Sequence, residues 1–454
     1  MNPEYRLRTE KWRNLLIFFM INLLVIFLVS MIKIDYASNN FIRIELSLNF
    51  DLIFIMEIII ITIFLQLIVL YTQIFLVFRR QGVFQIFPRQ EIPNNFSNPF
   101  SLEKKSYDLQ EIINSVLSIA EKVNISVKRI YLTLTPIPNA FTLNVPFIGS
   151  IINIDSNLVD ILDSDSLNTV ISHEIGHIKK SDSMLKLIII SPYTYLQIAL
   201  IFLYIQLFAG IVEGLIINND LISAFSRIFI FVLVYYFSRI ITSISSLFLF
   251  KAERAAESSA DIFAGKITSP ILVINALIKL GQRTEVINEL LDGFKQMESL
   301  QRKLLTPEDT SRLINLLNLY PVSEIDQKQA RIFAPYIYLV GQLRLLKNAY
   351  MVPLNDEMIH KIAVESVNNL ISVQKITFDP SESKLYAKLT KDWRTYDANQ
   401  DQFIDETELF AFIDMLRRMP NKFLFKSEIP RNFLMQDHPD FRNRILTLYE
   451  QFYE

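Results

Sequence analysis

The stretch His173-Glu174-Ile175-Gly176-His177 is the most informative part of this chain, because it places two of the four histidines four residues apart. On a helix, residues at this spacing lie on one face, so both imidazoles can bind one metal ion. Glu174 projects toward the same ion, where it can take a proton from a metal-bound water. The pattern therefore predicts a zinc site with Glu174 as general base. The alternative is a pair of surface histidines on an amphipathic helix.

A third ligand is expected, because a catalytic zinc ion usually takes three from the protein, and this chain has no cysteine. The helix-favouring run from Glu253 to Asp261 places Glu253, Glu257 and Asp261 on one face by the same four-residue spacing. One glutamate would bind the metal, and a carboxylate one turn further would accept the second ring N–H of a ligand histidine. The alternative is a solvated acidic stripe, and the spacing alone does not select between Glu253 and Glu257.

These two motifs carry a family resemblance. His173 to His177, followed by Glu257-Ser258-Ser259-Ala260-Asp261, resembles the membrane-integrated zinc metallopeptidases (gluzincins) that include HtpX and the CAAX prenyl protease. The resemblance implies that His173, His177 and Glu257 bind zinc, and that Asp261 orients a ligand from the second layer. It also implies an endopeptidase that cleaves membrane or membrane-associated proteins, with a role in membrane protein quality control.

Two weaker signatures agree with this resemblance. Pro138-Asn139-Ala140-Phe141 resembles the family's Asn-Ala-Phe segment, which implies that Asn139, Ala140 and Phe141 bind substrate along an edge strand. His438-Pro439 with Arg444-Ile445 resembles the family's C-terminal His-Pro element, which returns to the active-site region. We therefore expect His438 to be catalytic by stabilising the tetrahedral oxyanion, the alternative being a capping or packing histidine.

Composition indicates a membrane protein. Hydrophobic residues make up 51% of the chain and the mean hydropathy is +0.28, both high for a soluble domain. Four stretches are long enough to cross a hydrocarbon core of about 30 Å as helices. They are residues 14–32, 52–78, 187–208 and 222–250. For the second pair, the alternative is a buried hairpin within the catalytic body.

Flanking charges orient the predicted spans, because loops rich in Lys and Arg stay on the cytoplasmic side. Basic residues precede the first and third spans and follow the second and fourth. They are Arg6, Arg8, Lys11, Arg13, Arg79, Arg80, Lys179, Lys180, Lys186, Lys251 and Arg254. We expect both termini and the catalytic domain to be cytoplasmic. The net charge of −2 gives no reason to propose nucleic acid as a partner, which leaves peptide or protein substrates and the lipid bilayer.

The stretch from Asp397 to Glu408 resembles the calcium loop of an EF-hand. Oxygen-bearing residues occupy the first, third, fifth, ninth and twelfth positions, and Phe403 is placed to contribute its carbonyl. The predicted calcium ligands are Asp397, Asn399, Asp401, Phe403, Asp405 and Glu408. Gln402 stands where an EF-hand needs glycine, so we expect weak binding, and no second loop is present to pair with this one. The alternative is a metal-free connection between two helices.

The predicted fold is mainly α, with four transmembrane helices and a zinc metallopeptidase domain that contains a small β-sheet. A polar linker at residues 94–105, a helix at 109–123, two short strands within 130–155 and a zinc helix at 166–180 are expected. The predicted organisation is a membrane hairpin (1–80), a catalytic part with the first motif (81–186), a second membrane hairpin (187–250), a third-ligand helix (251–268), a helical region of unknown role (269–390), an EF-hand-like helix-loop-helix (391–416) and a C-terminal catalytic element (417–454). A different class stays open, namely a membrane-anchored calcium-responsive binding protein that retains a protease-like zinc fold.

Overall fold

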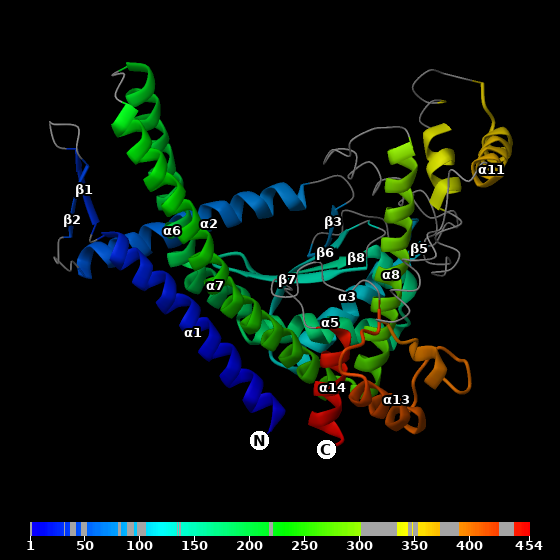
Figure 1. The fold of residues 1–454 in the computed structure, drawn as a ribbon. Helices are drawn as coiled ribbons and strands as arrows, with labels where there is room; N and C mark the ends of the chain where they lie inside the picture. Colours follow the sequence, from blue (N-terminus) through cyan, green and yellow to red (C-terminus); the bar gives the residue numbers. More distant parts are fainter. Residues whose placement is uncertain are drawn as a thin grey trace. The chain divides into compact units, whose positions relative to one another are not determined.

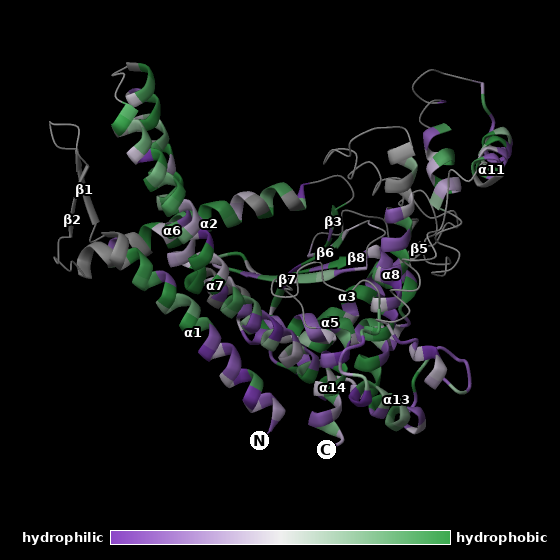
Figure 2. Cartoon of the chain, viewed as in Figure 1, coloured by the Kyte–Doolittle hydropathy of each residue, from purple (hydrophilic) through white to green (hydrophobic). Residues whose placement is uncertain are grey.

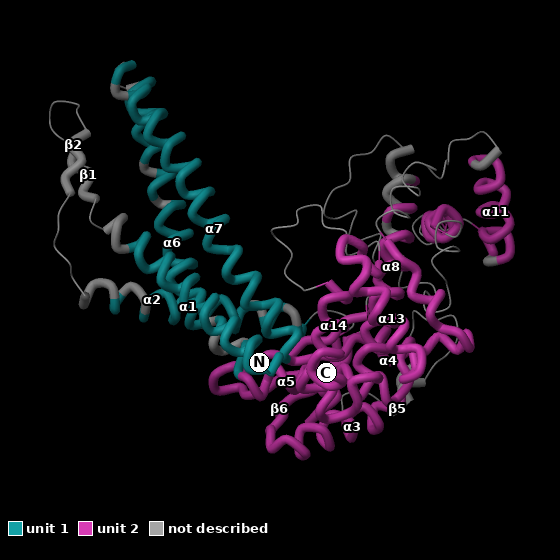
Figure 3. Tube along the Cα trace, turned by 60° about the horizontal axis from the view of Figure 1, so that its bottom comes forward, with its two compact units in different colours: residues 1–79, 181–259, 432–438 teal, residues 80–180, 260–431, 439–454 magenta. Residues whose placement is uncertain are grey.

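The fold was analysed in a computed structural model of the full chain (Figure 1). The described residues are 2–30, 32–36, 42–46, 52–79, 83–88, 95–97, 106–133, 135, 138–217, 221–300, 334–343, 347, 353–372, 390–425 and 440–454. They form two compact units, coloured separately in Figure 3: one built from residues 1–79 and 181–259, the other from 80–180, 260–431 and 439–454. The boundary at residue 259 falls inside one unbroken helix, so that helix runs from the first unit into the second.

The second unit holds a four-stranded mixed sheet. Its strands are β3 (Val83–Phe87), β6 (Val127–Thr133), β7 (Ala140–Val145) and β8 (Gly149–Asp155). The order is β3-β6-β8-β7, in which β6 and β8 are parallel and the other pairs antiparallel. Residues 130–155 therefore contribute to three strands rather than the predicted two. The additional strand is β6, which pairs in parallel with β8, although β7 lies between them in the chain. Alternation along the sequence does not reveal such a non-local pairing.

Two helices cover one face of this sheet. They are α3 (Leu109–Lys122) and α5 (Ser164–Lys179), each begun by an aspartate, Asp108 or Asp163, whose carboxylate accepts backbone N–H groups of the first turn. Their apolar faces and the facing strand residues form one buried cluster. It includes Ile112, Val116, Ile119, Ile130, Leu132, Ile152, Ile154, Ile171, Ile175 and Ile178. This core fixes α5, which carries the first motif, against the sheet.

The second unit contains further elements besides the sheet, α3 and α5. They are α4 (Ser156–Ile161), the end of α7 (Leu221–Ile267), α8 (Pro270–Leu300), α11 (Asp356–Ser372), the 3₁₀ helix η3 (Trp393–Tyr396), α13 (Glu406–Arg418) and α14 (Phe441–Phe452); β4 (Asn95–Ser97) and β5 (Ser106–Asp108) form a separate ribbon. Gly176 of α5 lets α7 approach closely, because a Cβ there would lie 2.9 Å from the ring of Phe263. From α8, Lys279 pairs with the capping carboxylate of Asp163.

The first unit contains the most apolar helices. They are α1 (Pro3–Ser30), α2 (Leu52–Phe78), α6 (Asp182–Val212) with the short π-helix η1 (Glu213–Ile217), and α7, with the ribbon β1 (Ile32–Tyr36) and β2 (Ile42–Leu46) after α1. Among the described residues, two helical stretches are long and apolar enough to cross a membrane, Ile188–Ile216 and Ala224–Ile267. Figure 2 colours much of α6 and the upper part of α7 as hydrophobic. Helix α6 continues through Pro192 without a break.

From Asn14 onward, helix α1 buries polar as well as apolar side chains, whereas the side chains that it exposes are apolar. Lys11, Asn14 and Asn22 are buried at helical spacing, together with Phe18. By contrast, large apolar side chains on the opposite side are about half exposed. They are Leu16, Met20 and Leu24. A helix on the surface of a water-soluble domain has the reverse pattern.

The buried polar groups of this unit bond between helices. Asn22 of α1 donates to Ser245 Oγ of α7 over 2.6 Å, and Gln66 of α2 donates to Thr194 Oγ1 of α6 over 2.6 Å. Tyr204 and Ser238 share a bond between α6 and α7. These hydrogen bonds connect helices inside an otherwise apolar bundle. The described chain is thus mainly helical with a small mixed sheet, as predicted.

Candidate metal centre

His173 and His177 face each other from consecutive turns of α5, as the spacing predicts. Their Nε2 atoms lie 3.2 Å apart, and the two rings stand almost perpendicular. Two nitrogens bound to one tetrahedral zinc ion at 2.0–2.1 Å would lie about 3.3 Å apart. The two imidazoles therefore already have the separation that a shared ion requires.

Asp261 fixes the orientation of His173. Its Oδ1 lies 2.8 Å from His173 Nδ1, so Nδ1 carries the proton and the Nε2 lone pair is left to face His177. Asp261 is only 1% exposed, and α14 supplies its counter-ion, because Arg444 donates to both carboxylate oxygens over 2.7 and 2.6 Å. Burial would raise the pKa of Asp261, but Arg444 and His173 outweigh it and hold that pKa at about 2. The carboxylate is therefore charged and accepts the histidine proton.

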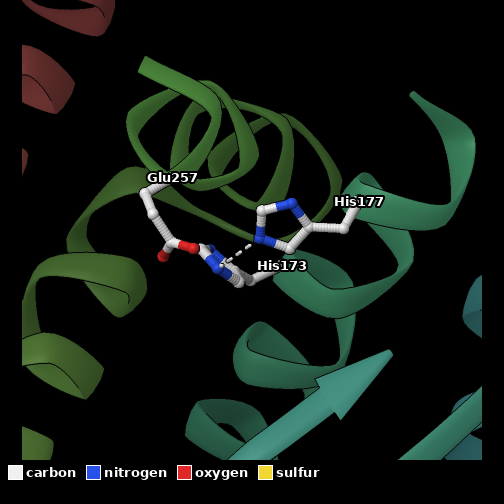
Figure 4. A group of neighbouring side chains, drawn as sticks. All are labelled: His173, His177 and Glu257. Carbon is white, nitrogen blue, oxygen red and sulfur yellow. Dashed lines mark hydrogen bonds between the residues drawn. The ribbon is translucent and has the colours of Figure 1, made fainter. Parts of the chain in front are cut away.

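Glu257 lies one turn before Asp261 on the same helix and completes the cluster (Figure 4). One ligand atom each from His173, His177 and Glu257 lie within 4.8 Å of one another, and this is the one such group found among the described residues. Glu253, the alternative ligand, is instead paired with Lys186 of α6. The structure thus brings Glu257 and not Glu253 to the two histidines. The donor set of two imidazoles and a carboxylate fits zinc.

Glu174 lies next to the cluster on α5 and is 8% exposed. Its backbone carbonyl accepts a bond of 3.4 Å from the Thr142 hydroxyl, so the first motif is joined to β7. Strand β7 begins at Ala140 and Phe141 and lies at the edge of the described sheet. Asn139 precedes it, is exposed, and accepts a backbone bond from Asp155 over 3.0 Å. The three residues of the Asn-Ala-Phe segment therefore lie on an edge strand beside the helix that carries Glu174.

Asp155, at the end of β8, is a buried carboxyl that sequence reasoning did not single out. Burial raises its pKa to about 7, although a 2.8 Å bond from the Asn153 amide lowers it in part. Asn153 in turn accepts from the Thr133 hydroxyl over 2.7 Å. The chain of hydrogen bonds from Thr133 through Asn153 therefore ends at Asp155, whose backbone N–H donates to the Asn139 carbonyl.

The C-terminal signature is partly placed. His438 and Pro439 lie outside the described residues, so the role expected for His438 stays a prediction. Arg444 and Ile445 lie on α14, where Ile445 is fully buried and Arg444 binds Asp261. Sequence reasoning noted Arg444 as part of a motif but missed its function. Nothing in the two segments, which lie 183 residues apart, specified this pairing.

The residues predicted to bind calcium form a closed loop whose oxygens bond to its own backbone. Asp397 accepts from the N–H groups of Asp401 and Gln402 over 3.2 and 2.9 Å. Glu408 accepts from Ala398 over 2.6 Å, and together with Asp405 forms a capping box that begins α13. Other ligand candidates do the same: Asn399 accepts from Asp401, and Asp401 accepts from Phe403. Gln402 has φ +63°, the strained conformation expected where an EF-hand has glycine.

The segment that enters this loop differs from the prediction. It is the 3₁₀ helix η3 rather than an α-helix, and Lys391, two residues before η3, donates to the Phe423 carbonyl over 3.0 Å. A side chain of α8 forms hydrogen bonds with the backbone of this loop. The Asn275 amide of α8 accepts from Ile404 N–H over 2.7 Å and donates to the Ile404 carbonyl over 2.9 Å, and both residues are fully buried.

The sequence comparisons agree with this site. The profile of Peptidase family M48 matches residues 103–451. A protease HtpX homolog from Picrophilus torridus is 38% identical over 78 residues, covering 17% of this chain and 25% of the relative. Another from Sulfurihydrogenibium sp. is 24% identical over 262 residues, covering 55% and 86%. A plastoglobule-localized metallopeptidase 48 from Arabidopsis thaliana is 32% identical over 71 residues, covering 16% and 21%.

The first relatives are therefore matched over about a quarter of their own length. No solved structure matches this chain. The family profile, however, extends over most of the chain and includes both motifs, the C-terminal helix and Arg444. Together with the converging side chains of His173, His177 and Glu257, it establishes that this chain belongs to Peptidase family M48.

Proposed function

We propose that this protein is a membrane-integrated zinc endopeptidase that cleaves membrane or membrane-associated proteins, in the quality control of membrane proteins. The observation that carries the proposal is the converging group His173, His177 and Glu257, with Glu174 beside it. Membership of a peptidase family and similarity to HtpX homologs indicate a metalloprotease. Asp261 and Arg444 give the group a charged second layer, which a degenerate scaffold would not need.

Each residue of the site has a separate role in the proposed peptide hydrolysis. When bound, zinc would supply Lewis acidity and make water a stronger nucleophile at neutral pH. Glu174 takes the proton of the attacking water and returns it to the leaving amine. Substrate adds to β7 as a further strand beside Asn139, Ala140 and Phe141, since an edge strand has unpaired backbone groups. His438 donates to the oxyanion of the tetrahedral intermediate.

The exposed apolar side chains of α1, together with its buried asparagines, support membrane integration beyond hydropathy. In a bilayer, the exposed apolar side chains of Leu16, Met20 and Leu24 can face lipid. Asn14 and Asn22 then face the neighbouring helices, away from lipid. We propose that α1, α2, α6 and the first part of α7 all span the membrane, with both termini cytoplasmic.

The cysteine-free chain allows a direct test of this topology. Single cysteines at Asn40 and Asn218 should react with an impermeant maleimide outside intact cells. Cysteines at Asn94 and Thr306 should react only after permeabilisation. Outside labelling at Asn94 would place the catalytic domain in the other compartment.

The decisive experiment on the proposed activity compares wild type with Glu174→Gln. The substitution keeps the shape of the side chain and removes the base, so zinc should be retained at one ion per chain. The rate should fall at least about a hundredfold, as expected for acid–base catalysis. Proteomic comparison of membranes from the two strains should reveal membrane-protein fragments that depend on Glu174.

Retained zinc with identical fragment patterns in both strains would contradict the proposed proteolysis. That result would favour the alternative of a membrane-anchored, calcium-responsive binding protein with a protease-like zinc fold. The loop from Asp397 to Glu408 is the observation behind this second candidate. We propose that the loop binds calcium weakly and modulates cleavage through α13.

A further inference from the structure

The turn that joins β7 to β8 has an unusual backbone. The strands pair as far as Val145 and Gly149, which leaves a loop of three residues, Pro146, Phe147 and Ile148. Ile148 N–H bonds to the Pro146 carbonyl over 2.8 Å, and Phe147 between them has φ +65°. A three-residue turn with positive φ at its centre is rare and strained. Strain held in a well-formed hairpin is a reason to look for a function.

The strained residue is also fully exposed. The Phe147 side chain is 100% exposed, more than any other large apolar side chain among the described residues. Folding therefore gives this ring no contact that would offset the strain of its backbone. An apolar partner outside the described part of the chain would.

A cationic side chain lies beside the base of this turn. Lys128 sits in the bulge between Val127 and Arg129 of β6 and is exposed. Its Cγ lies 2.6 Å from the position that a Cβ on Gly149 would take, and Gly149 itself has φ +89°. Glycine at this position thus lets the lysine stem pass directly along the base of the turn.

An exposed aromatic ring next to a lysine is the pairing that anchors proteins at a lipid–water interface, the ring among the acyl chains and the amine at anionic head groups. A three-residue tip offers little area for a protein partner. A bilayer, however, can take a single inserted ring. The chain itself reaches a membrane under the proposed function, because α6 begins at Asp182, shortly after the second zinc histidine.

We propose that the β7–β8 tip, residues 146–148, inserts Phe147 into the lipid–water interface while Lys128 contacts anionic lipid head groups. This inference rests on the proposed membrane integration but not on the proposed proteolysis. It deepens the substrate assignment, because β7 is the proposed substrate strand. A tip docked in this way would hold that strand at the membrane surface, where segments next to a transmembrane span become extended.

The absence of native cysteine gives a clean test. Phe147→Cys, in a Glu174→Gln background that prevents self-cleavage, is labelled with an environment-sensitive NBD fluorophore. The full-length protein is placed in nanodiscs of phosphatidylcholine with phosphatidylglycerol. We expect blue-shifted emission that is quenched by spin-labelled lipids carrying the label near the head group. Asn114→Cys, at an exposed position of α3, is the matched control and should report water.

Charge is tested in the same preparation. Lys128→Gln should reduce quenching of the Phe147 probe in discs with phosphatidylglycerol to the level seen with phosphatidylcholine alone. Zinc content equal to wild type confirms that each variant is folded. Emission at Phe147 that matches the Asn114 control in anionic discs would overturn the inference. So would a shift that occurs only when unfolded casein is added, because the tip would then be a substrate contact.

Discussion

The zinc cluster and the calcium-like loop were both predicted from short motifs, yet they differ in how their ligands are held. In the cluster, His173, His177 and Glu257 point at one another, and Asp261 of α7 fixes His173. In the loop, the carboxylates of Asp397 and Glu408 are occupied by backbone N–H groups of the loop itself. A motif thus indicates which atoms could bind an ion. The surrounding packing decides whether those atoms converge before the ion arrives.

The sharpest way to break this contrast is to remove one ligand of the cluster. Glu257→Ala should lower zinc affinity more than about a hundredfold, beyond the range of second-layer changes, because only two protein ligands remain. Glu253→Ala, four residues away and paired with Lys186, is the matched control and should keep zinc. Metal analysis after dialysis against a zinc chelator measures both. Zinc lost from Glu253→Ala and kept in Glu257→Ala would reverse the assignment.

A smaller effect is expected from Arg444, a positioning residue that acts through Asp261. Arg444→Met leaves Asp261 buried without its counter-ion, so zinc affinity should fall about ten- to a hundredfold. Arg444→Lys should recover part of the loss. Competition with a fluorescent chelator gives the affinities. Cobalt-substituted protein gives an absorption spectrum that should change in Arg444→Met.

Arg442→Met controls for general damage to α14, because Arg442 donates to the Leu416 carbonyl rather than to the metal site. Equal zinc affinity in both methionine variants would remove Arg444 from the second layer.

For the loop, the expected effects are weaker still. Glu408→Gln should weaken calcium binding most, since the twelfth position supplies the bidentate carboxylate. Asn275→Ala removes two buried hydrogen bonds to Ile404 at roughly 1 kcal/mol each. Because these bonds also stabilise the metal-free loop, only part of this free energy is lost from binding, and calcium affinity should fall about tenfold. Gln402→Gly should strengthen it by relieving the positive φ. Isothermal titration of the detergent-solubilised protein can rank these variants.

Asp414→Asn, a carboxylate of α13 outside the loop that pairs with Arg418, is the matched control. No calcium heat at millimolar concentration in either wild type or Gln402→Gly would make the loop a metal-free connector.

The last of these predictions concerns stability rather than ion binding, at Asp155. A carboxyl whose pKa is raised on folding stabilises the fold most below its ordinary value of 3.8, and this contribution is lost as pH rises toward 7. Asp155→Asn stays neutral, so wild type should lose about 2 kcal/mol relative to the variant between pH 5 and 8. Melting temperatures at the two pH values measure the difference. Glu121→Gln, exposed on α3, should give no such pH dependence, and a constant gap for Asp155→Asn would show an ordinary carboxyl.

Local spacing predicted much of this architecture. The position of His173 and His177 on one helical face follows from periodicity along the chain. Two of the four expected spans pass as long apolar helices among the described residues. The other two expected spans, in α1 and α2, are not among these two helices. For α1, the argument for a span is that its exposed side chains from Asn14 onward are apolar while Asn14 and Asn22 are buried.

Non-local partners could not be predicted. Ile404 and Asn275 are 129 residues apart, and nothing in either segment specifies the other. Arg444 finds Asp261 across 183 residues for the same reason. The choice of Glu257 over Glu253 came from a family resemblance, and in the structure it depends on where Lys186 of α6 lies. Such contacts arise from how helices pack, which sequence periodicity does not record.

X-ray absorption at the zinc edge of the purified full-length protein tests the central claim most directly. Two imidazoles at about 2.0–2.1 Å and oxygen donors at about 2.0–2.2 Å are predicted, without sulfur. Glu257→Ala should alter this first shell or lose the metal, while Glu174→Gln should leave the imidazole count unchanged. Three imidazoles in wild type would bring His360 or His438 into the first shell and contradict the assignment of Glu257. Zinc bound through sulfur or through oxygen alone would contradict the site itself.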